Sequence, residues 1–433
     1  MPQHIERLIW PRQRIQAERQ RALRATLQVA KERSPWYAQR LAHIDPANAT
    51  EADLDLIPPM TKDDLMANFD AILTDRALSQ DMVESHLDRL SEDAYLLDRY
   101  HVFASGGSSG RRGVFVYDWA GWLICGLSIA RFRTRAFRVA GVGRGDLVVQ
   151  VAGGKASHMT YAMSSTFGAS TGMVAVPATL PRDEIVSRLN ELQPAALAGY
   201  PSALYSLARE AAAGRLRIAP RFVNTGSEPL LPEMRAVIEE AWGRKVLNIY
   251  GTSEGATASG CGAGPGLHLN EDFCIFEPVA DNGQPVAPGE RAARMYITRL
   301  YNDVQPLIRY EMTDEVTLLD EKCNCGSGMQ LITDIGGRSD DAFTYASGLV
   351  VHPITFRSPL GRERNVIEYQ VRQTARGASI HLGADGPVDV GNLQGTIERE
   401  LAALGLLQPE VTVTLVDGFE RLSTGKLKRF FPL

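Results

Sequence analysis

The chain has 433 residues, of which 44% are hydrophobic and 22% are charged. This length allows two or three domains with buried cores, and the composition excludes a peptide hormone, a fibrous protein and global disorder. The 51 acidic and 46 basic residues leave a net charge of −5, which offers no electrostatic basis for a nucleic-acid partner.

The sequence predicts a cytoplasmic protein without a membrane anchor. Its N-terminal residues contain no apolar segment of signal-peptide length, and no later apolar run approaches the roughly 18 residues that cross a bilayer. The five cysteines are too few and too unevenly spaced for a disulfide framework.

The first predicted element is a helix over residues 12–32, in which Ile15, Leu23, Leu27 and Val29 recur at roughly helical spacing. We interpret it as a surface helix rather than as the ligand of a partner's groove. From residue 146 onward, short apolar strands at 147–151, 173–176 and 246–249 alternate with helices at 182–192 and 232–242. This alternation predicts an α/β fold with layered sheets and helices.

The pattern changes after Arg338. Strands at 368–373, 379–382 and 411–415 surround a helix at 390–404, which predicts a small α+β unit of about 95 residues. We place the boundary between Gly336 and Asp341. The chain is then divided into an N-terminal domain of residues 1–338 and a C-terminal domain of residues 339–433.

A loop rich in glycine and serine, ASGGSSGRRG at residues 104–113, precedes an apolar strand at 114–117. Such a loop can direct backbone N–H groups and hydroxyls onto phosphate oxygens, and arginines can add charge-assisted hydrogen bonds. It is not a Walker A loop, because no Gly-Lys-Ser/Thr follows at the required spacing. Taken alone, the segment fits a plain flexible loop equally well.

Five further motifs follow in a fixed order: NTGSEPL at 224–230, IYGTSEG at 249–255, IRYEMTD at 308–314, GRSDD at 337–341 and RLSTGK at 421–426. With the glycine-rich loop, they resemble the adenylate-forming (acyl-CoA synthetase, ANL) superfamily over residues 105–426. The segments RSPWY at 33–37, IPPMTKDDL at 57–65, GLHLNED at 266–272 and CNCG at 323–326 resemble its phenylacetate-CoA ligase branch.

The resemblance implies a ligase with a large N-terminal adenylation domain and a small mobile C-terminal domain. An aryl carboxylic acid and ATP would give acyl-AMP and pyrophosphate, and coenzyme A would then give acyl-CoA and AMP. Phenylacetate and a benzoate-type acid such as anthranilate are the expected substrates. Transfer of the acyl group to a carrier protein or an amine remains an alternative, as does a non-catalytic nucleotide-binding protein of the same fold. A homodimer is also left open.

The resemblance also implies roles for particular residues. Lys426 would neutralise the carboxylate and the α-phosphate, Glu254 would hold Mg²⁺, and Asp340 would be the hinge before the C-terminal domain. Thr252 joins Lys426 and Glu254 as a catalytic residue. The implied ATP-binding residues are Ser105, Gly106, Gly107, Ser108, Ser109, Gly110, Arg111, Ser227, Glu228, Pro229, Tyr250, Gly251, Thr252, Asp314 and Arg338. The implied acyl-pocket residues are His158, Met159, Tyr161, Gly226 and Gly251.

The chain departs from the family at the phosphate loop, where Arg111 and Arg112 stand in place of the usual lysine. Arginine keeps the positive charge but presents it as a planar fork. Without the other motifs, Lys426 would be read as an exposed lysine, Glu254 and Asp314 as surface carboxylates, and Asp340 as a helix or turn cap.

A separate set of residues predicts a structural zinc site. Cys261, His268, Cys323 and Cys325 supply three thiols and one imidazole, the number of ligands that a closed zinc site needs. The alternative is three reduced thiols and a core histidine. Cys125 and Cys274 lie in apolar segments and are predicted to belong to the core.

Overall fold

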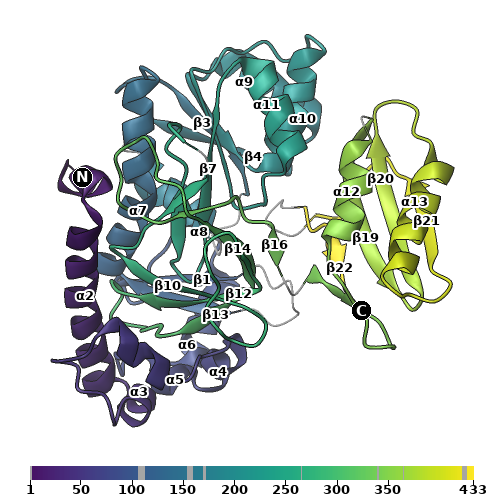
Figure 1. Cartoon of the computed structure of the whole chain (residues 1–433). Helices are drawn as coiled ribbons and strands as arrows, with labels where there is room; N and C mark the ends of the chain where they lie inside the picture. Colours follow the sequence, from purple (N-terminus) through teal and green to yellow (C-terminus); the bar gives the residue numbers. More distant parts are fainter. Residues whose placement is uncertain are drawn as a thin grey trace.

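The first part of the chain is helical (Figure 1). A computed structural model describes residues 2–105, 113–153, 159–168, 172–264, 266–338, 341–363, 365–421 and 427–433. The helical segments are α1 (Pro2–Glu6), η1 (Arg7–Ile9), α2 (Arg12–Arg33), α3 (Pro35–Arg40), η2 (Glu51–Leu56), α4 (Lys62–Ala67), α5 (Phe69–Ile72) and α6 (Gln80–Arg89). Helix α2 confirms the helix predicted over 12–32, and it buries Ile15, Leu23 and Leu27 on one face.

A large mixed sheet forms the centre of the molecule. Its order is β11-β14-β15-β9-β8-β7-β6-β5-β3-β4, and β16 also pairs with β14. The strands are β3 (Val148–Ala152), β4 (Met173–Pro177), β5 (Ala196–Gly199), β6 (Phe222–Gly226), β7 (Val246–Gly251), β8 (Thr257–Ser259), β9 (Leu267–Leu269), β11 (Arg291–Ala292), β14 (Asp314–Leu319), β15 (Leu331–Ile332) and β16 (Gly337–Arg338). The strands predicted at 147–151, 173–176 and 246–249 are confirmed as β3, β4 and β7, and the α/β class is confirmed.

Helices cover both faces of the parallel strands. They are α7 (Trp119–Val139), α8 (Met159–Gly168), α9 (Arg182–Leu192), α10 (Pro201–Ala212) and α11 (Pro232–Trp242), of which α9 and α11 were predicted. Val149 and Val151 pack with α9, α10 and α11, whereas Val148 packs with Phe137 of α7. Successive side chains of a strand point to opposite faces, so Gln150 points to the same face as Val148.

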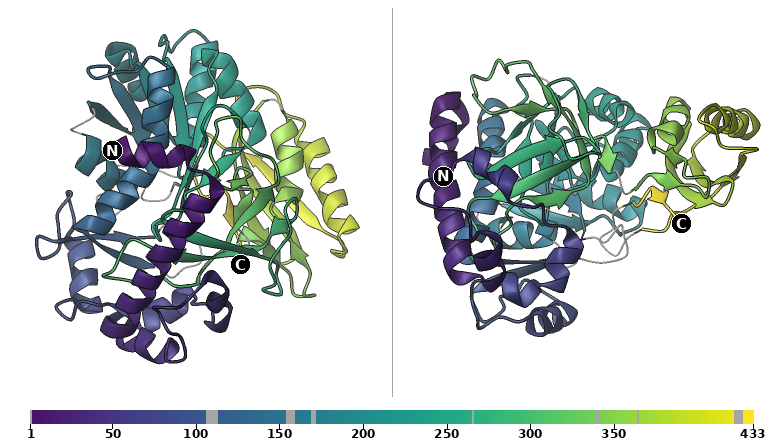
Figure 2. Two further views of the ribbon diagram at one scale, coloured as in Figure 1. Left: turned by 60° about the vertical axis from the view of Figure 1, so that its left-hand side comes forward. Right: turned by 60° about the horizontal axis from the view of Figure 1, so that its bottom comes forward.

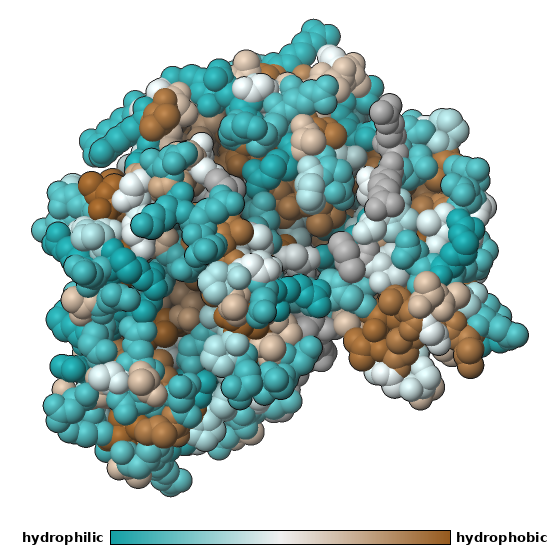
Figure 3. All heavy atoms as spheres, in the orientation of Figure 1, coloured by the Kyte–Doolittle hydropathy of each residue, from teal (hydrophilic) through white to brown (hydrophobic). Residues whose placement is uncertain are grey.

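Smaller sheets complete this part of the chain. Strands β1 (Tyr100–Ala104) and β2 (Val114–Asp118) form a hairpin, and β10 (Cys274–Val279), β12 (Arg294–Arg299) and β13 (Tyr310–Met312) form a three-stranded sheet. No helix in the described ranges combines the length and the apolar character that crossing a bilayer requires. The face seen in Figure 3 is mostly hydrophilic.

The C-terminal residues form a sheet of their own, in the order β21-β20-β19-β22, beside the rest of the molecule (Figures 1 and 2). The elements are β17 (Phe343–Thr344), β18 (Val350–Val351), α12 (Ile354–Arg362), β19 (Val366–Thr374), β20 (Gly377–Ala384), α13 (Val390–Ala403), β21 (Glu410–Leu415) and β22 (Phe430–Phe431). The strands and the helix predicted here are confirmed as β19, β20, β21 and α13. A separate hydrophobic cluster, from Phe343 to Phe430, lies within these elements.

A buried ion pair fastens α7 to the loop before β10. Arg131 donates to Asp272 at 2.8 and 2.6 Å, and both side chains are fully buried. Arg131 also donates from Nε to Asn270 Oδ1 at 3.1 Å and lies over the ring of Phe273. Because α7 covers the face of the sheet that carries Gln150, this ion pair holds one wall of the site described below.

We predict that Asp272→Asn lowers the free energy of unfolding by about 3–5 kcal/mol, since the buried guanidinium loses its counter-charge. Urea denaturation followed by tryptophan fluorescence measures the change. The control is Asp281→Asn, at a carboxylate that is 92% exposed, with an expected change within about 0.5 kcal/mol. Equal effects of the two substitutions would contradict the role given to the ion pair.

Candidate active site

Three buried side chains donate hydrogen bonds to the backbone of the loop after β7. Three successive carbonyl groups accept a hydrogen bond each: Tyr117 Oη donates to Ser253 at 2.8 Å, Arg299 Nη1 to Glu254 at 2.9 Å, and Tyr301 Oη to Gly255 at 2.9 Å. Arg299 has no exposed surface, and burial raises the pKa of Tyr117 and of Tyr301, so both phenols remain protonated donors. The backbone of residues 253–255 is therefore fixed.

Glycine is required at position 255. Its φ is +93°, a conformation that L side chains rarely adopt, and an added Cβ would lie 2.4 Å from Tyr301 Oη and 2.8 Å from Tyr117 Oη. The motif at residues 249–255 thus contains a glycine that packing requires, in addition to residues with polar side chains that could take part in a reaction.

The carboxylate of Glu254 is buried, with 5% of the residue exposed. Burial raises its pKa above the usual value, and the positive charge of Arg338 opposes that shift. The side chain of Thr252 is held by a residue of its own loop, because Ala256 N–H donates to Thr252 Oγ1 at 3.2 Å. A divalent cation beside Glu254 would favour the charged form of this carboxylate.

A chain of hydrogen bonds joins three of the predicted residues. Tyr250 Oη donates to Asp314 Oδ2 at 2.9 Å, and Arg338 Nε donates to Asp314 Oδ1 at 3.3 Å. The pairing of β14 with β16 brings Asp314 directly opposite Arg338. Burial and the charge of Asp314 raise the pKa of Tyr250 well above its usual value, so the phenol stays a donor.

The segment after β6 contacts both α8 and the C-terminal residues. Ser227 has a φ of +68°, and its Oγ lies 3.2 Å from Thr160 Oγ1. Glu228 accepts from Ser202 N–H at 3.2 Å and from Leu427 N–H at 3.1 Å. Pro229 follows and is partly buried. The residue directly after Lys426 is therefore bound to the segment predicted to flank the nucleotide.

Several predicted residues lie outside the described residues: Gly106, Gly107, Ser108, Ser109, Gly110, Arg111, His158, Asp340 and Lys426. Ser105 is described, and it marks one end of the glycine-rich loop. Ser105 N–H donates to the carbonyl of Gly113 at 2.8 Å, and Gly113 N–H donates to Ser105 Oγ at 2.8 Å. The two ends of the loop are thus tied together at the base of the β1–β2 hairpin.

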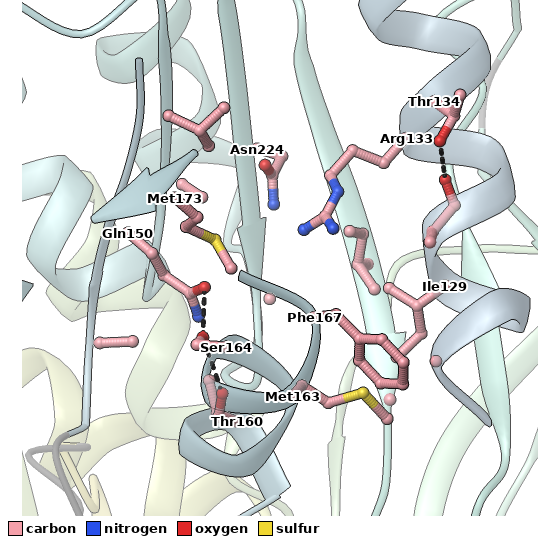
Figure 4. A pocket seen from close by; sticks show the side chains of 18 of the residues that line it. Ile129, Arg133, Thr134, Gln150, Thr160, Met163, Ser164, Phe167, Met173 and Asn224 are labelled. Atoms are coloured by element: carbon pink, nitrogen blue, oxygen red, sulfur yellow. Dashed lines mark hydrogen bonds between the residues drawn. The ribbon is translucent and has the colours of Figure 1, made fainter. Parts of the chain in front are cut away.

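A cavity of about 1140 Å³ opens beside these groups, between α7, α8 and the sheet (Figure 4). Gly226, Gly251 and Met159 line it, as predicted for acyl-pocket residues. Tyr161 is not in the lining, because the face of α8 that meets the cavity carries Thr160, Met163, Ser164 and Phe167.

The sequence analysis missed Arg133, Gln150 and Asn224 in the lining, and also the supports Tyr117, Arg299 and Tyr301. Arg133 lies in a long helix without a motif and Gln150 interrupts an apolar strand, whereas Asn224 begins the motif at 224–230 but the resemblance implies no role for it. A polar residue inside an otherwise apolar strand is the one signal in the sequence that points to this face.

The four predicted metal ligands converge. Cys261 Sγ lies 3.3 Å from Cys323 Sγ, Cys325 Sγ lies 3.5 Å from His268 Nε2, and all four ligand atoms lie within 4.8 Å of one another. Ligands of a tetrahedral zinc ion are about 3.3–3.8 Å apart, given metal–ligand distances of about 2.0–2.3 Å. Backbone N–H groups of Ala263 and Cys325 donate to two of the sulfurs. The donor set and spacing therefore suit zinc, whereas Cys125 and Cys274 are buried elsewhere in the core.

No protein-family model matches the chain. The phenylacetate-coenzyme A ligase of Thermus thermophilus is 26% identical over 356 residues, which cover 79% of this chain and 74% of the relative. That of Pseudomonas putida is 28% identical over 392 residues, covering 85% and 78%. A crystal structure of 2-hydroxyisobutyryl-CoA ligase in the postadenylation state, in complex with R3-HIB-AMP, aligns with a TM-score of 0.75 at 19% identity, over 99% of this chain and 91% of the other. The structural likeness shows a shared fold.

We predict that Gly255→Ala lowers the free energy of unfolding by about 3 kcal/mol or more, because it combines backbone strain with loss of hydrogen bonds from Tyr117 and Tyr301. The matched control is Gly289→Ala, where φ is +87° and an added Cβ meets nothing within 4 Å. That variant should lose only about 1 kcal/mol. Similar losses in chemical denaturation of both variants would contradict the packing argument.

Proposed function

We propose that this chain, an adenylate-forming superfamily member that resembles phenylacetate-CoA ligase, is an AMP-forming acid–CoA ligase acting on an aryl carboxylic acid. In the first half-reaction a carboxylate oxygen attacks the α-phosphate of ATP, and acyl-AMP and pyrophosphate result. In the second, the thiol of coenzyme A attacks the acyl carbon and AMP leaves. Phenylacetate, which the names of the sequence relatives contain, or a benzoate-type acid such as anthranilate is the proposed substrate.

One observation carries the proposal: the Tyr250–Asp314–Arg338 chain lies beside buried Glu254, and Gly251, the residue after Tyr250, lines a cavity of about 1140 Å³ together with Gly226 at the end of the neighbouring strand β6. A carboxylate has about four lone-pair sites. Asp314 therefore keeps sites for the ribose hydroxyls while it accepts from Tyr250 and Arg338. The cavity offers the neighbouring space that the acyl group needs.

Charge builds up on the α-phosphate and on the leaving pyrophosphate during adenylation, so the site must supply cations and donors. We assign Lys426 to the carboxylate and the α-phosphate, and the glycine-rich loop to the leaving group. The hydrogen bond from Leu427 N–H to Glu228 supports this role for Lys426, because it holds the adjacent residue at the nucleotide segment. Asp340 is the proposed hinge by which residues 339–433 would withdraw Lys426 before thioester formation.

Metal ions have two distinct roles in the proposal. Glu254 would hold Mg²⁺, which neutralises phosphate charge when bound. A structural zinc ion would be held by the cluster of Cys261, His268, Cys323 and Cys325. It would join the loop after β8 and strand β9 to the segment at residues 323–325, which precedes Arg338 in the sequence. With four protein ligands such a site is closed, so the zinc takes no part in chemistry.

The proposal is tested by a pyrophosphate-release screen over aryl and aliphatic acids with ATP, run with and without free coenzyme A. Acid-dependent pyrophosphate release and coenzyme-A-dependent release of AMP are expected. AMP release that needs a carrier protein or an amine instead of coenzyme A would identify the other kind of acyl acceptor. No acid-dependent release at all would overturn the proposal.

We predict that Lys426→Ala slows adenylation by about 100-fold or more, because a charged donor at the first transition state is lost. Thioester formation from supplied acyl-AMP should be much less affected. Separate assays of pyrophosphate release and of thioester formation measure the two steps, and Lys428→Ala serves as the control. An equal loss in both half-reactions would refute the assigned role.

For the zinc site we predict about one zinc ion per chain by elemental analysis, with Zn–S distances of about 2.3 Å by X-ray absorption. Cys325→Ser should lose the metal and lower the melting temperature more than it changes the turnover of the protein that stays folded. Cys125→Ser, at a thiol outside the cluster, should keep its zinc. A metal-free preparation with full activity and an unchanged melting temperature would rule the site out.

A further inference from the structure

The cavity is larger than a single aromatic ring needs. Its volume of about 1140 Å³ slightly exceeds the range of ordinary ligand pockets, which is about 300–1,000 Å³. Apolar side chains form much of the wall, among them Ile129, Met163, Phe167 and Met173 (Figure 4). Such walls suit the body of an apolar acid, so the polar groups among them decide which acid fits best.

Arg133 is one of three arginines that line this cavity. It extends from α7 into the cavity, toward Asn224 on β6 (Figure 4). Within the described part of the chain no hydrogen bond or ion pair is made by its guanidinium, and its one ring contact is a distant one, 6.0 Å from Phe137. Burial lowers the pKa of Arg133, and no neighbouring carboxylate offsets this effect. Arg133 is partly buried, so its guanidinium loses part of its hydration without gaining an acceptor from the described residues, and a ligand anion would supply the missing acceptors.

The described charged residues that line the cavity all carry positive charge. Arg138 and Arg144 line it together with Arg133, and none of its described lining residues is an aspartate or a glutamate. The potential in this region is therefore positive, which favours an anion.

Two amides lie on the same side of the sheet. The Asn224 side chain makes no hydrogen bond to another described residue, although the residue is only 7% exposed. Gln150 Oε1 accepts from Ser164 Oγ at 2.7 Å, an arrangement that orients the amide beside the cavity. Asn224 precedes Gly226 by two residues of β6, or about 7 Å along the strand. Asn224, and Arg133 that points toward it (Figure 4), thus lie farther from the carboxyl end of β6 than Gly226, one of the glycines proposed to flank the reacting carboxylate.

We infer that the preferred substrate is a dicarboxylic acid with an apolar, aryl-sized body, whose remote carboxylate is bound by Arg133 and Asn224. This inference rests on the proposed function and names the substrate class of the same site. The guanidinium fork matches a carboxylate bidentately, and Asn224 can donate a further hydrogen bond. A monocarboxylic acid such as phenylacetate still fits the apolar part of the cavity, but it leaves the guanidinium without an acceptor and therefore binds less tightly than the diacid.

The test compares terephthalate with para-methylbenzoate, which has a methyl group in place of the second carboxylate. In the wild-type protein, terephthalate should bind about 10- to 100-fold more tightly in isothermal titration calorimetry. Arg133→Met should remove most of this preference and leave the binding of para-methylbenzoate within about threefold. Arg133→Lys should restore it in part, because the charge is kept and the fork is lost.

Arg188→Met is the matched control, since Arg188 lies on α9 in a surface ion pair with Glu184. Three results would each overturn the inference. They are equally tight binding of the two acids by the wild-type protein, no detectable binding of terephthalate to it, and an unchanged preference for terephthalate in Arg133→Met. The pyrophosphate-release assay with the same acids keeps the two proposals separate. Turnover of monocarboxylic acids without any diacid preference contradicts only the inference, whereas binding of the diacid without adenylation of any acid, mono- or dicarboxylic, contradicts the proposed function.

Discussion

The candidate site depends on the hydrogen bonds by which Tyr117, Arg299 and Tyr301 hold the carbonyl groups of residues 253–255. A loop that follows a strand has few backbone partners of its own, and buried carbonyls must find donors elsewhere. Here each donor comes from a different position outside the loop, so the loop is fixed only when the β1–β2 hairpin and β12 are in place. The position of Glu254 is therefore a consequence of tertiary packing rather than of the local motif.

The alternation of side chains along the parallel strands gives the sheet one closely packed face and one face that lines the cavity. Val149 and Val151 pack against α9, α10 and α11 and form a closed core. Gln150 and Asn224 face α7 and α8, where a cavity remains. The Arg131–Asp272 ion pair holds helix α7 in its position over the cavity. The same helix places Arg133 in the cavity wall, one turn after Ile129. Helix α7 thus carries Arg131, which makes the buried ion pair, and Arg133, to which we assign substrate binding.

Much of the fold could be predicted from the sequence. The spacing of the apolar residues indicated β3, β4, β7, α9, α11 and the C-terminal α+β elements. In these segments the local sequence pattern agrees with the secondary structure that the fold requires. The ordered motifs indicated Tyr250, Asp314 and Arg338, and the number and kind of the Cys and His residues indicated the four-ligand set, whose convergence the structure shows. Arg133 and Arg299 could not be found in this way. Each is one arginine among many, and only the packing of distant elements makes it buried and places it near the site.

The central claim is that the acid is activated through adenylation, with a carboxylate oxygen bonded to the α-phosphate. The most direct measurement uses an accepted acid whose carboxylate oxygens carry a heavy isotope, followed by mass spectrometry of the products after the complete reaction with coenzyme A. The account predicts one labelled oxygen in AMP, since the bond that breaks in the second half-reaction is the one between the acyl carbon and that oxygen. Unlabelled AMP, with the label in inorganic phosphate instead, would contradict it.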